Sequence, residues 1–128
     1  MSRCATLNLF LQQGEARAMH IRYVDKEDEP VVDLSTYEGV LQVREDYASD
    51  ATMLLELTSQ DNEITFDGAD GSIYITFPLS KVNDLPVDER GIDGWVYGFQ
   101  IYDPTDKDNT ARLLLRGEVA VQPTAVRE

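Results

Sequence analysis

Hydrophobic and polar residues alternate along most of the chain, so the dominant period of the pattern is two. Between residues 95 and 102, for example, apolar residues occupy every odd position from Trp95 to Ile101. Successive side chains of a β-strand point to opposite faces, so this alternation predicts a strand with one buried face. Seven other stretches share the pattern, and the predicted strands are 6–11, 17–23, 41–44, 53–57, 64–66, 73–77, 95–102 and 112–121.

The spacing of these stretches predicts an all-β domain that covers residues 1–128. Turn signals separate them at intervals typical of an antiparallel sandwich or barrel, and the gaps are too short for the crossover helices of a parallel sheet. We expect at most one short helical turn near 79–85, where "PLSKVNDLP" offers Ser80 as a cap and Pro86 as a stop. Gly117 interrupts the last predicted strand, which indicates a bulge or bend.

Acidic residues gather at two predicted turns. In "EITFDGADGSIYITFP" (63–78), two Asp-Gly steps separate two predicted strands, which is a strong hairpin signal. A calcium loop needs oxygen ligands at fixed offsets, and neither Asp67 with Asp70 nor Asp106 with Asp108 meets that spacing. Turns are therefore favoured over cation sites at both places, and we predict no metal and no cofactor.

The charge of the chain narrows the classes of partner. Acidic residues outnumber basic ones by 24 to 11, and the net charge of −13 disfavours both nucleic acid and anionic membranes.

Cys4 is the only cysteine, which excludes an internal disulfide. No apolar run approaches the roughly 20 residues needed to span a bilayer, and the N-terminus makes a poor signal peptide. We expect synthesis in a reducing cytoplasm.

The sequence offers no constellation of catalytic groups. His20 is the only histidine and lies within a predicted strand, and nothing around Cys4 indicates an activated thiol. Phosphate-binding, dinucleotide-binding and nucleophile-elbow motifs are missing from the sequence. Trp95, Tyr97 and Phe99 could form a sugar-stacking platform, but their shared parity favours packing in the core. We therefore predict that the protein is not an enzyme.

Some apolar residues fall at positions that should point away from the core. Such residues are common on ordinary surfaces, and together they could equally mark a surface that docks on another chain. Arg17 shows the reverse pattern, a charge at a core-directed position, which fits either a snorkelling side chain or a strand edge. The candidate protein-contact surface consists of Phe10, Leu54, Tyr74, Tyr102 and Leu114.

Two long segments resemble a family of small virion proteins of tailed bacteriophages. They are "QQGEARAMHIRYVDKEDEPVVDLSTYEGVLQVRED" (12–46) and "GWVYGFQIYDPTDKDNTARLLLRGEVAVQPTAV" (94–126), and the strands between them fit the same order. The resemblance implies an immunoglobulin-like β-sandwich, similar to the N-terminal domain of baseplate upper-fibre proteins. It further implies a protein without a catalytic site that is located in the virion. Such a protein forms a homo-oligomer or is present in multiple copies in the particle, and it contacts other tail, baseplate, fibre or capsid proteins.

The expected function is therefore that of a non-enzymatic structural protein of the tail or baseplate region, which assembles parts or anchors a fibre through protein–protein contacts. One alternative is a capsid decoration (cement) protein of the same fold, which differs only in its location. Another is a carbohydrate-binding module for receptor recognition. That alternative predicts Trp95, or Tyr74 together with Tyr102, on a groove open to solvent.

Overall fold

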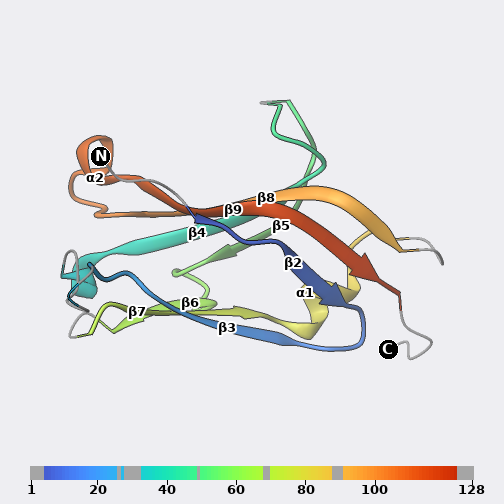
Figure 1. Ribbon diagram of the computed structural model, residues 1–128, viewed down its shortest axis with the longest axis horizontal. Coiled ribbons are helices and arrows are strands. Elements are labelled where there is room, and N and C mark those ends of the chain that lie inside the picture. The colour runs from blue at the N-terminus through green and yellow to red at the C-terminus, as the bar shows by residue number, and fades with distance from the viewer. Residues whose placement is uncertain are drawn as a thin grey trace.

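The computed structural model describes residues 5–25, 27, 33–48, 50–67, 70–87 and 91–123, which form two β-sheets packed face to face (Figure 1). The larger sheet has the order β1-β9-β8-β4-β5, and β2 also pairs with β9. Its strands are β1 (Ala5–Thr6), β2 (Leu9–Gln12), β4 (Glu38–Arg44), β5 (Met53–Thr58), β8 (Ile92–Tyr102) and β9 (Arg112–Gln122). The smaller sheet has the order β3-β7-β6, with strands β3 (Arg17–Arg22), β6 (Ile64–Asp67) and β7 (Ser72–Phe77).

This strand order is that of the immunoglobulin fold. If the strands from β3 onward are lettered B, C, C′, D, E, F and G in chain order, the two sheets become B-E-D and G-F-C-C′. The apolar faces of both sheets meet in one core, where side chains such as Leu41, Ile75 and Phe99 are fully buried. The prediction of an all-β, immunoglobulin-like sandwich is therefore confirmed.

The structure corrects the predicted strand count and strand direction. It describes nine strands where about eight were expected, and β1 and β2 run parallel to β9 in an otherwise antiparallel arrangement. The reason lies in the chain path, because the N-terminal segment enters the larger sheet beside the last strand and not beside its own neighbour β3. Arg17 is exposed at the start of β3, an edge strand, which fits the strand-edge interpretation.

Helical structure is more frequent than predicted. Helix α1 (Leu79–Asn83) confirms the predicted turn, but Pro78 is its N-cap and no side chain caps it, so the assignment of Ser80 as the cap is wrong. A 3-10 turn at Leu34–Thr36 follows Asp33, whose carboxylate accepts a hydrogen bond from the backbone N–H of Ser35. The short helix α2 (Lys107–Thr110) lies in the β8–β9 connection. Local side-chain-to-backbone bonds form such single turns without any apolar periodicity that a sequence pattern could display.

Two β-bulges change which residues face the core. The register between β4 and β5 shifts after Val43 and skips Leu54, and the register between β8 and β9 shifts after Phe99 and skips Leu114. An extra residue in one strand reverses the orientation of the residues beyond it. Leu54 and Leu114 consequently pack against the core. Met53 and Leu113, expected in the core, are exposed instead.

Gly117 marks a close contact between strands. A bulge or a bend was predicted there, and the bulge is wrong because the register of β9 is regular at Gly117. A Cβ atom on Gly117 would lie 2.3 Å from the carbonyl oxygen of Leu7. The same carbonyl accepts a 2.6 Å hydrogen bond from the hydroxyl of Tyr97. The missing side chain therefore lets the segment between β1 and β2 pass directly against β9.

Candidate functional site

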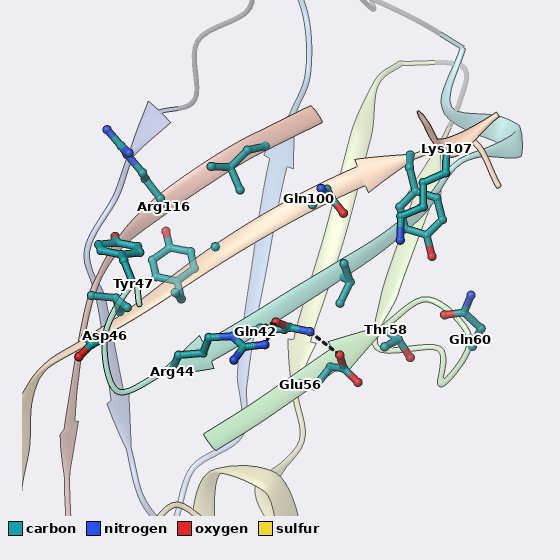
Figure 2. Close-up of a pocket in the computed structure, with 16 residues that line it drawn as sticks. Gln42, Arg44, Asp46, Tyr47, Glu56, Thr58, Gln60, Gln100, Lys107 and Arg116 are labelled. Atoms are coloured by element: carbon teal, nitrogen blue, oxygen red, sulfur yellow. Dashed lines mark hydrogen bonds between the residues drawn. The ribbon is translucent and has the colours of Figure 1, made fainter. Parts of the chain in front are cut away.

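A groove of about 540 Å³ lies over the larger sheet, on the face that points away from the core (Figure 2). Residues of β4, β5, β8 and β9 form it, together with residues from the β4–β5 and β8–β9 connections. The strands present their second, outward set of side chains here, since the first set fills the core. Part of the outward face of the larger sheet is thus open for contacts at the groove.

One row of residues crosses the floor of the groove. Glu56, Gln42, Gly98 and Arg116 are register partners on four adjacent strands. Gly98 contributes no side chain to this row, while its neighbours carry long polar ones. The groove is therefore hollowed at Gly98 and bordered by a carboxylate on the β5 side and a guanidinium on the β9 side.

A hydrogen-bond network fixes the side chains on the β4 and β5 side. The amide nitrogen of Gln42 donates to Glu56 Oε2 at 2.7 Å, as the dashed line in Figure 2 marks. Gln42 Oε1 in turn accepts from Arg44 Nε at 3.1 Å and Nη2 at 2.9 Å, and Arg44 Nη1 donates to the carbonyl of Ala51 at 2.9 Å. These donors and acceptors satisfy one another, so this wall is held in a defined shape before any ligand binds.

None of the three basic side chains of the groove has a carboxylate partner within the described part of the chain, but Gln42 and the carbonyl of Ala51 hold Arg44. Arg116 is exposed and forms no ion pair there, and the Lys107 ammonium lies 4.6 Å from the ring centroid of Tyr102. Arg44, Arg116 and Lys107 line the groove against two acidic residues, Asp46 and Glu56. The groove is thus less acidic than the rest of a chain whose net charge is −13.

Two tyrosines occupy the end of the groove near β9. Tyr47, 63% exposed, donates its hydroxyl to the carbonyl of Gly117 at 3.3 Å. Tyr97 is almost fully buried and donates to Leu7, as described above. Burial raises the pKa of Tyr97 to about 12, and the nearby Tyr47 contributes in the same direction. Tyr97 therefore stays protonated, and its hydrogen bond intact, throughout the neutral range.

The structure does not bring the five residues of the candidate contact surface together. Tyr102 lines the groove, while Phe10 is exposed on β2 and does not line it. Tyr74 is exposed on the smaller sheet, so the predicted pair of Tyr74 with Tyr102 does not form. Leu54 and Leu114 pack against the core because of the two bulges.

Sequence reasoning placed Tyr102 in the candidate contact surface but missed other residues of the groove, among them Gln42, Gly98 and Arg116. All three lie at positions that alternation assigns to the outward face of their strands. Alternation alone gave no reason to single them out, because their proximity depends on which strands are neighbours and in which register.

His20 and Trp95 lie outside the groove lining. On the smaller sheet, His20 stacks on Tyr74 with 4.6 Å between ring centroids, and its Nε2 lies 2.9 Å from the hydroxyl oxygen of the fully buried Ser72. Trp95 is half-buried and packs against the core. Cys4 falls outside the described residues. The groove, as far as the described residues show, does not pair a nucleophile with a histidine.

The described residues on both sides of the acidic stretch between β6 and β7 form a hairpin, and Gly68 and Ala69 lie outside the described residues. The two strands pair in antiparallel fashion, and Gly71 takes a φ of 75°, a conformation that favours glycine. The carboxylate of Asp70 accepts a 2.9 Å hydrogen bond from the N–H of Ser72. Hydrogen bonds from the side chain and the backbone of Ser72 lower the pKa of Asp70. Asp70 therefore acts as a turn residue.

The loop that contains Asp106 and Asp108 also forms a turn. Asp103 Oδ1 accepts from the backbone N–H and the hydroxyl of Thr105, and Asp106 Oδ1 accepts from the side chain of Asn109. Within the described ranges no group of three or more His, Cys, Asp or Glu residues is arranged to hold a metal ion. None of the helices in the described ranges is long and apolar enough to cross a membrane.

Comparisons with known proteins give a likeness of fold only. No protein-family model matches the chain, and no curated protein matches it. Among solved structures, it is similar to the extracellular domain of the voltage-gated sodium channel β4 subunit, described as a parallel homodimer in cell–cell adhesion. The identity there is 9%, coverage is 97% of each chain and the TM-score is 0.37. A second structure, from a study of cell-adhesive interactions of sodium channel β subunits, has 9% identity, covers 94% of this chain and 93% of its own, and has a TM-score of 0.42.

Proposed function

We propose that this protein is a non-enzymatic structural component of the tail or baseplate region of a bacteriophage. In this role it assembles parts or anchors a fibre through protein–protein contacts, in several copies per particle. The virion assignment rests on the sequence resemblance over residues 12–46 and 94–126. The structural observation that carries the proposal is the groove on the free face of the larger sheet.

The groove suits contact with another protein for two reasons. Its lining combines apolar side chains such as Val40, Val96 and Leu113 with amides and charged groups, as protein interfaces do. The network of Gln42, Glu56 and Arg44 is arranged before binding, which reduces the entropy that a contact would otherwise lose. A binding module with a preformed face fits an assembly role.

Locating the protein in the particle tests this proposal. Virions of the phage that encodes the chain would be purified, and the protein would be sought by mass spectrometry and by gold-labelled antibodies in electron microscopy. Label at the tail or baseplate supports the proposal. Label over the capsid would replace it with the decoration protein of the same fold, and absence of the protein from purified particles would refute both.

Carbohydrate binding is a second candidate because Tyr102 and Tyr47 both line the groove beside several amides. Sugar rings stack on open aromatic faces, and here Lys107 lies over the Tyr102 ring while the Tyr47 hydroxyl is bound to the backbone of Gly117. Trp95, the other predicted platform residue, does not line the groove. Saturable binding on a glycan array, lost in a Tyr102→Ala variant, would favour this candidate over protein contact.

A further inference from the structure

The charges and the shape of the groove indicate which kind of partner it would bind. We propose that it binds an extended, acidic segment of a different protein, and that Arg116 and Lys107 recognise two carboxylates of that segment. This inference rests on the proposed function, since it names the kind of partner that the same groove would take.

Charge is the first argument. Three basic side chains, Arg44, Arg116 and Lys107, line the groove with two acidic ones, in a chain whose net charge is −13. Gln42 and the carbonyl of Ala51 hold Arg44. Arg116 and Lys107 have no carboxylate partner among the described residues, and Lys107 lies over the ring of Tyr102. Two carboxylates of a bound ligand would pair with these cations, one accepting charge-assisted hydrogen bonds from the guanidinium and the other from the ammonium.

Geometry is the second argument. Figure 2 shows Arg116 and Lys107 toward opposite ends of the groove. Arg116 is the register partner of Gly98, and Lys107 lies over Tyr102, four residues further along β8. Four residues of strand correspond to roughly 13 Å, so an extended ligand would bring two carboxylates into place from positions i and i+4. Both positions lie on one face of an extended chain because its side chains alternate.

The floor of the groove supplies the third argument. Gln100 lies midway between the two cations along β8, and its register partner on β9, Leu113, is 43% exposed. An apolar side chain at position i+2 of the ligand would lie against Leu113, while the ligand backbone would pass over Gly98, which has no side chain, beside Arg116. An aliphatic floor suits a polypeptide better than a saccharide, because a saccharide would need the aromatic face of Tyr102 that Lys107 covers.

The test uses the full-length protein and a fluorescent peptide, TETVTET, with glutamates at i and i+4 and a central valine. Binding would be followed by fluorescence anisotropy at about 50 mM NaCl, where screening is modest. The matched peptide TQTVTQT removes only the two charges. We expect the glutamate peptide to bind with a dissociation constant on the order of 100 μM and the glutamine peptide to bind at least tenfold more weakly. Equal binding of both peptides, or no binding of either, would overturn the proposal.

Variants localise the contact. Arg116→Gln and Lys107→Gln should each weaken binding of the glutamate peptide about three- to tenfold, as the loss of one charged contact predicts. Gly98→Val should abolish binding because its side chain would fill the position beside Arg116 over which the ligand backbone would pass. A Cβ there meets only the side chain of Leu113, at 3.4 Å, so the fold should persist, and its melting curve verifies this. The control is Arg17→Gln, which changes the net charge equally at an exposed site on β3. Weakening by Arg17→Gln as strong as that by Arg116→Gln would refute recognition in the groove.

Two further outcomes would assign the groove to another occupant. Concentration-dependent self-association that Gly98→Val abolishes would give it to a second copy of the chain. Saturable glycan binding that Gly98→Val abolishes would give it to a saccharide. Either result overturns this inference, and the particle-location experiment is independent of it. A virion protein that fails to bind the glutamate peptide would therefore leave the proposed function standing and the acidic partner refuted.

Discussion

At the contact between β9 and the N-terminal segment, glycine fits at position 117, whereas a residue with a Cβ atom would clash. A Cβ on Gly117 would approach the carbonyl oxygen of Leu7 to 2.3 Å and its carbon to 2.8 Å. The neighbouring segment is fixed from both sides, because the Leu7 N–H donates to Arg116 and Asn8 Oδ1 accepts from Glu118. The backbone has little freedom to move away.

We therefore expect Gly117→Ala to lower the free energy of unfolding by about 1–3 kcal/mol, the usual cost of overpacking. Urea denaturation followed by tryptophan fluorescence measures it. Gly98→Ala is the matched control, since it adds the same methyl group to a strand position where the nearest atom lies at 3.4 Å. Equal losses in both variants would mean that the Leu7 contact does not restrict the site.

The buried hydroxyl of Tyr97 gives a prediction that depends on pH. Its pKa is raised from 10.0 to about 12 in the folded protein. The stabilisation linked to this shift is fully present below pH 10 and is lost as the pH rises through the folded pKa, because the unfolded chain releases the proton first. The free energy of unfolding should therefore decline between pH 10 and 12 more steeply in the wild type than in Tyr97→Phe.

Two measurements check the role of Tyr97. Absorbance at 295 nm reports tyrosine ionisation, and the difference between wild type and Tyr97→Phe should be a single titration near pH 12. At neutral pH the variant should be about 1–2 kcal/mol less stable, because the carbonyl of Leu7 loses its hydroxyl donor. A difference titration centred near pH 10 would show that this hydroxyl is not buried in solution.

Among the elements, β5 is an edge strand of the larger sheet, and helix α1 supplies the side chain that covers it. Lys81 Nζ donates to the carbonyl of Glu56 at 2.8 Å and forms a 2.5 Å ion pair with Glu63. Glu63 is 8% exposed, and its other oxygen accepts from the N–H of Thr58. Lysines on edge strands commonly prevent pairing with other molecules, and Lys81 does so from a neighbouring helix.

Replacement of Lys81 with methionine should have two separable effects. The loss of the ion pair leaves the Glu63 carboxylate buried without its cation, and we expect a destabilisation of about 1–3 kcal/mol. The freed edge of β5 should also promote self-association, measurable by analytical ultracentrifugation. Adding Glu63→Gln should recover much of the stability but leave the self-association. A double variant that stays monomeric would show that Lys81 does not protect the edge.

The alternation of residues predicted most of the strands because each buries one face, and this burial is visible in sequence as period two. It failed at Leu54 and Leu114, because a bulge depends on the partner strand and leaves no mark in the composition of either strand. The groove could not be predicted for a related reason. Gln42, Gly98 and Arg116 come together only through the register of three strands.

For the whole molecule, the large net charge affects stability through repulsion between like charges. A net charge of −13 on 128 residues produces self-repulsion in the compact state, which the unfolded chain relieves by expanding. Salt screens this repulsion over distances of about 10 Å at 0.1 M ionic strength. The free energy of unfolding at pH 7 should therefore increase when sodium chloride is raised from about 0.02 to 0.3 M, on the order of 1 kcal/mol.

The same salt titration at pH 4.3, near the isoelectric point, provides the control, because the net repulsion vanishes there and the effect of salt should be small. Lys81 and Glu63 oppose the trend locally, since screening weakens their attraction, but one partly buried pair is small against thirteen uncompensated charges. Denaturation midpoints that fall with salt at pH 7 would mean that local ion pairs outweigh the net repulsion.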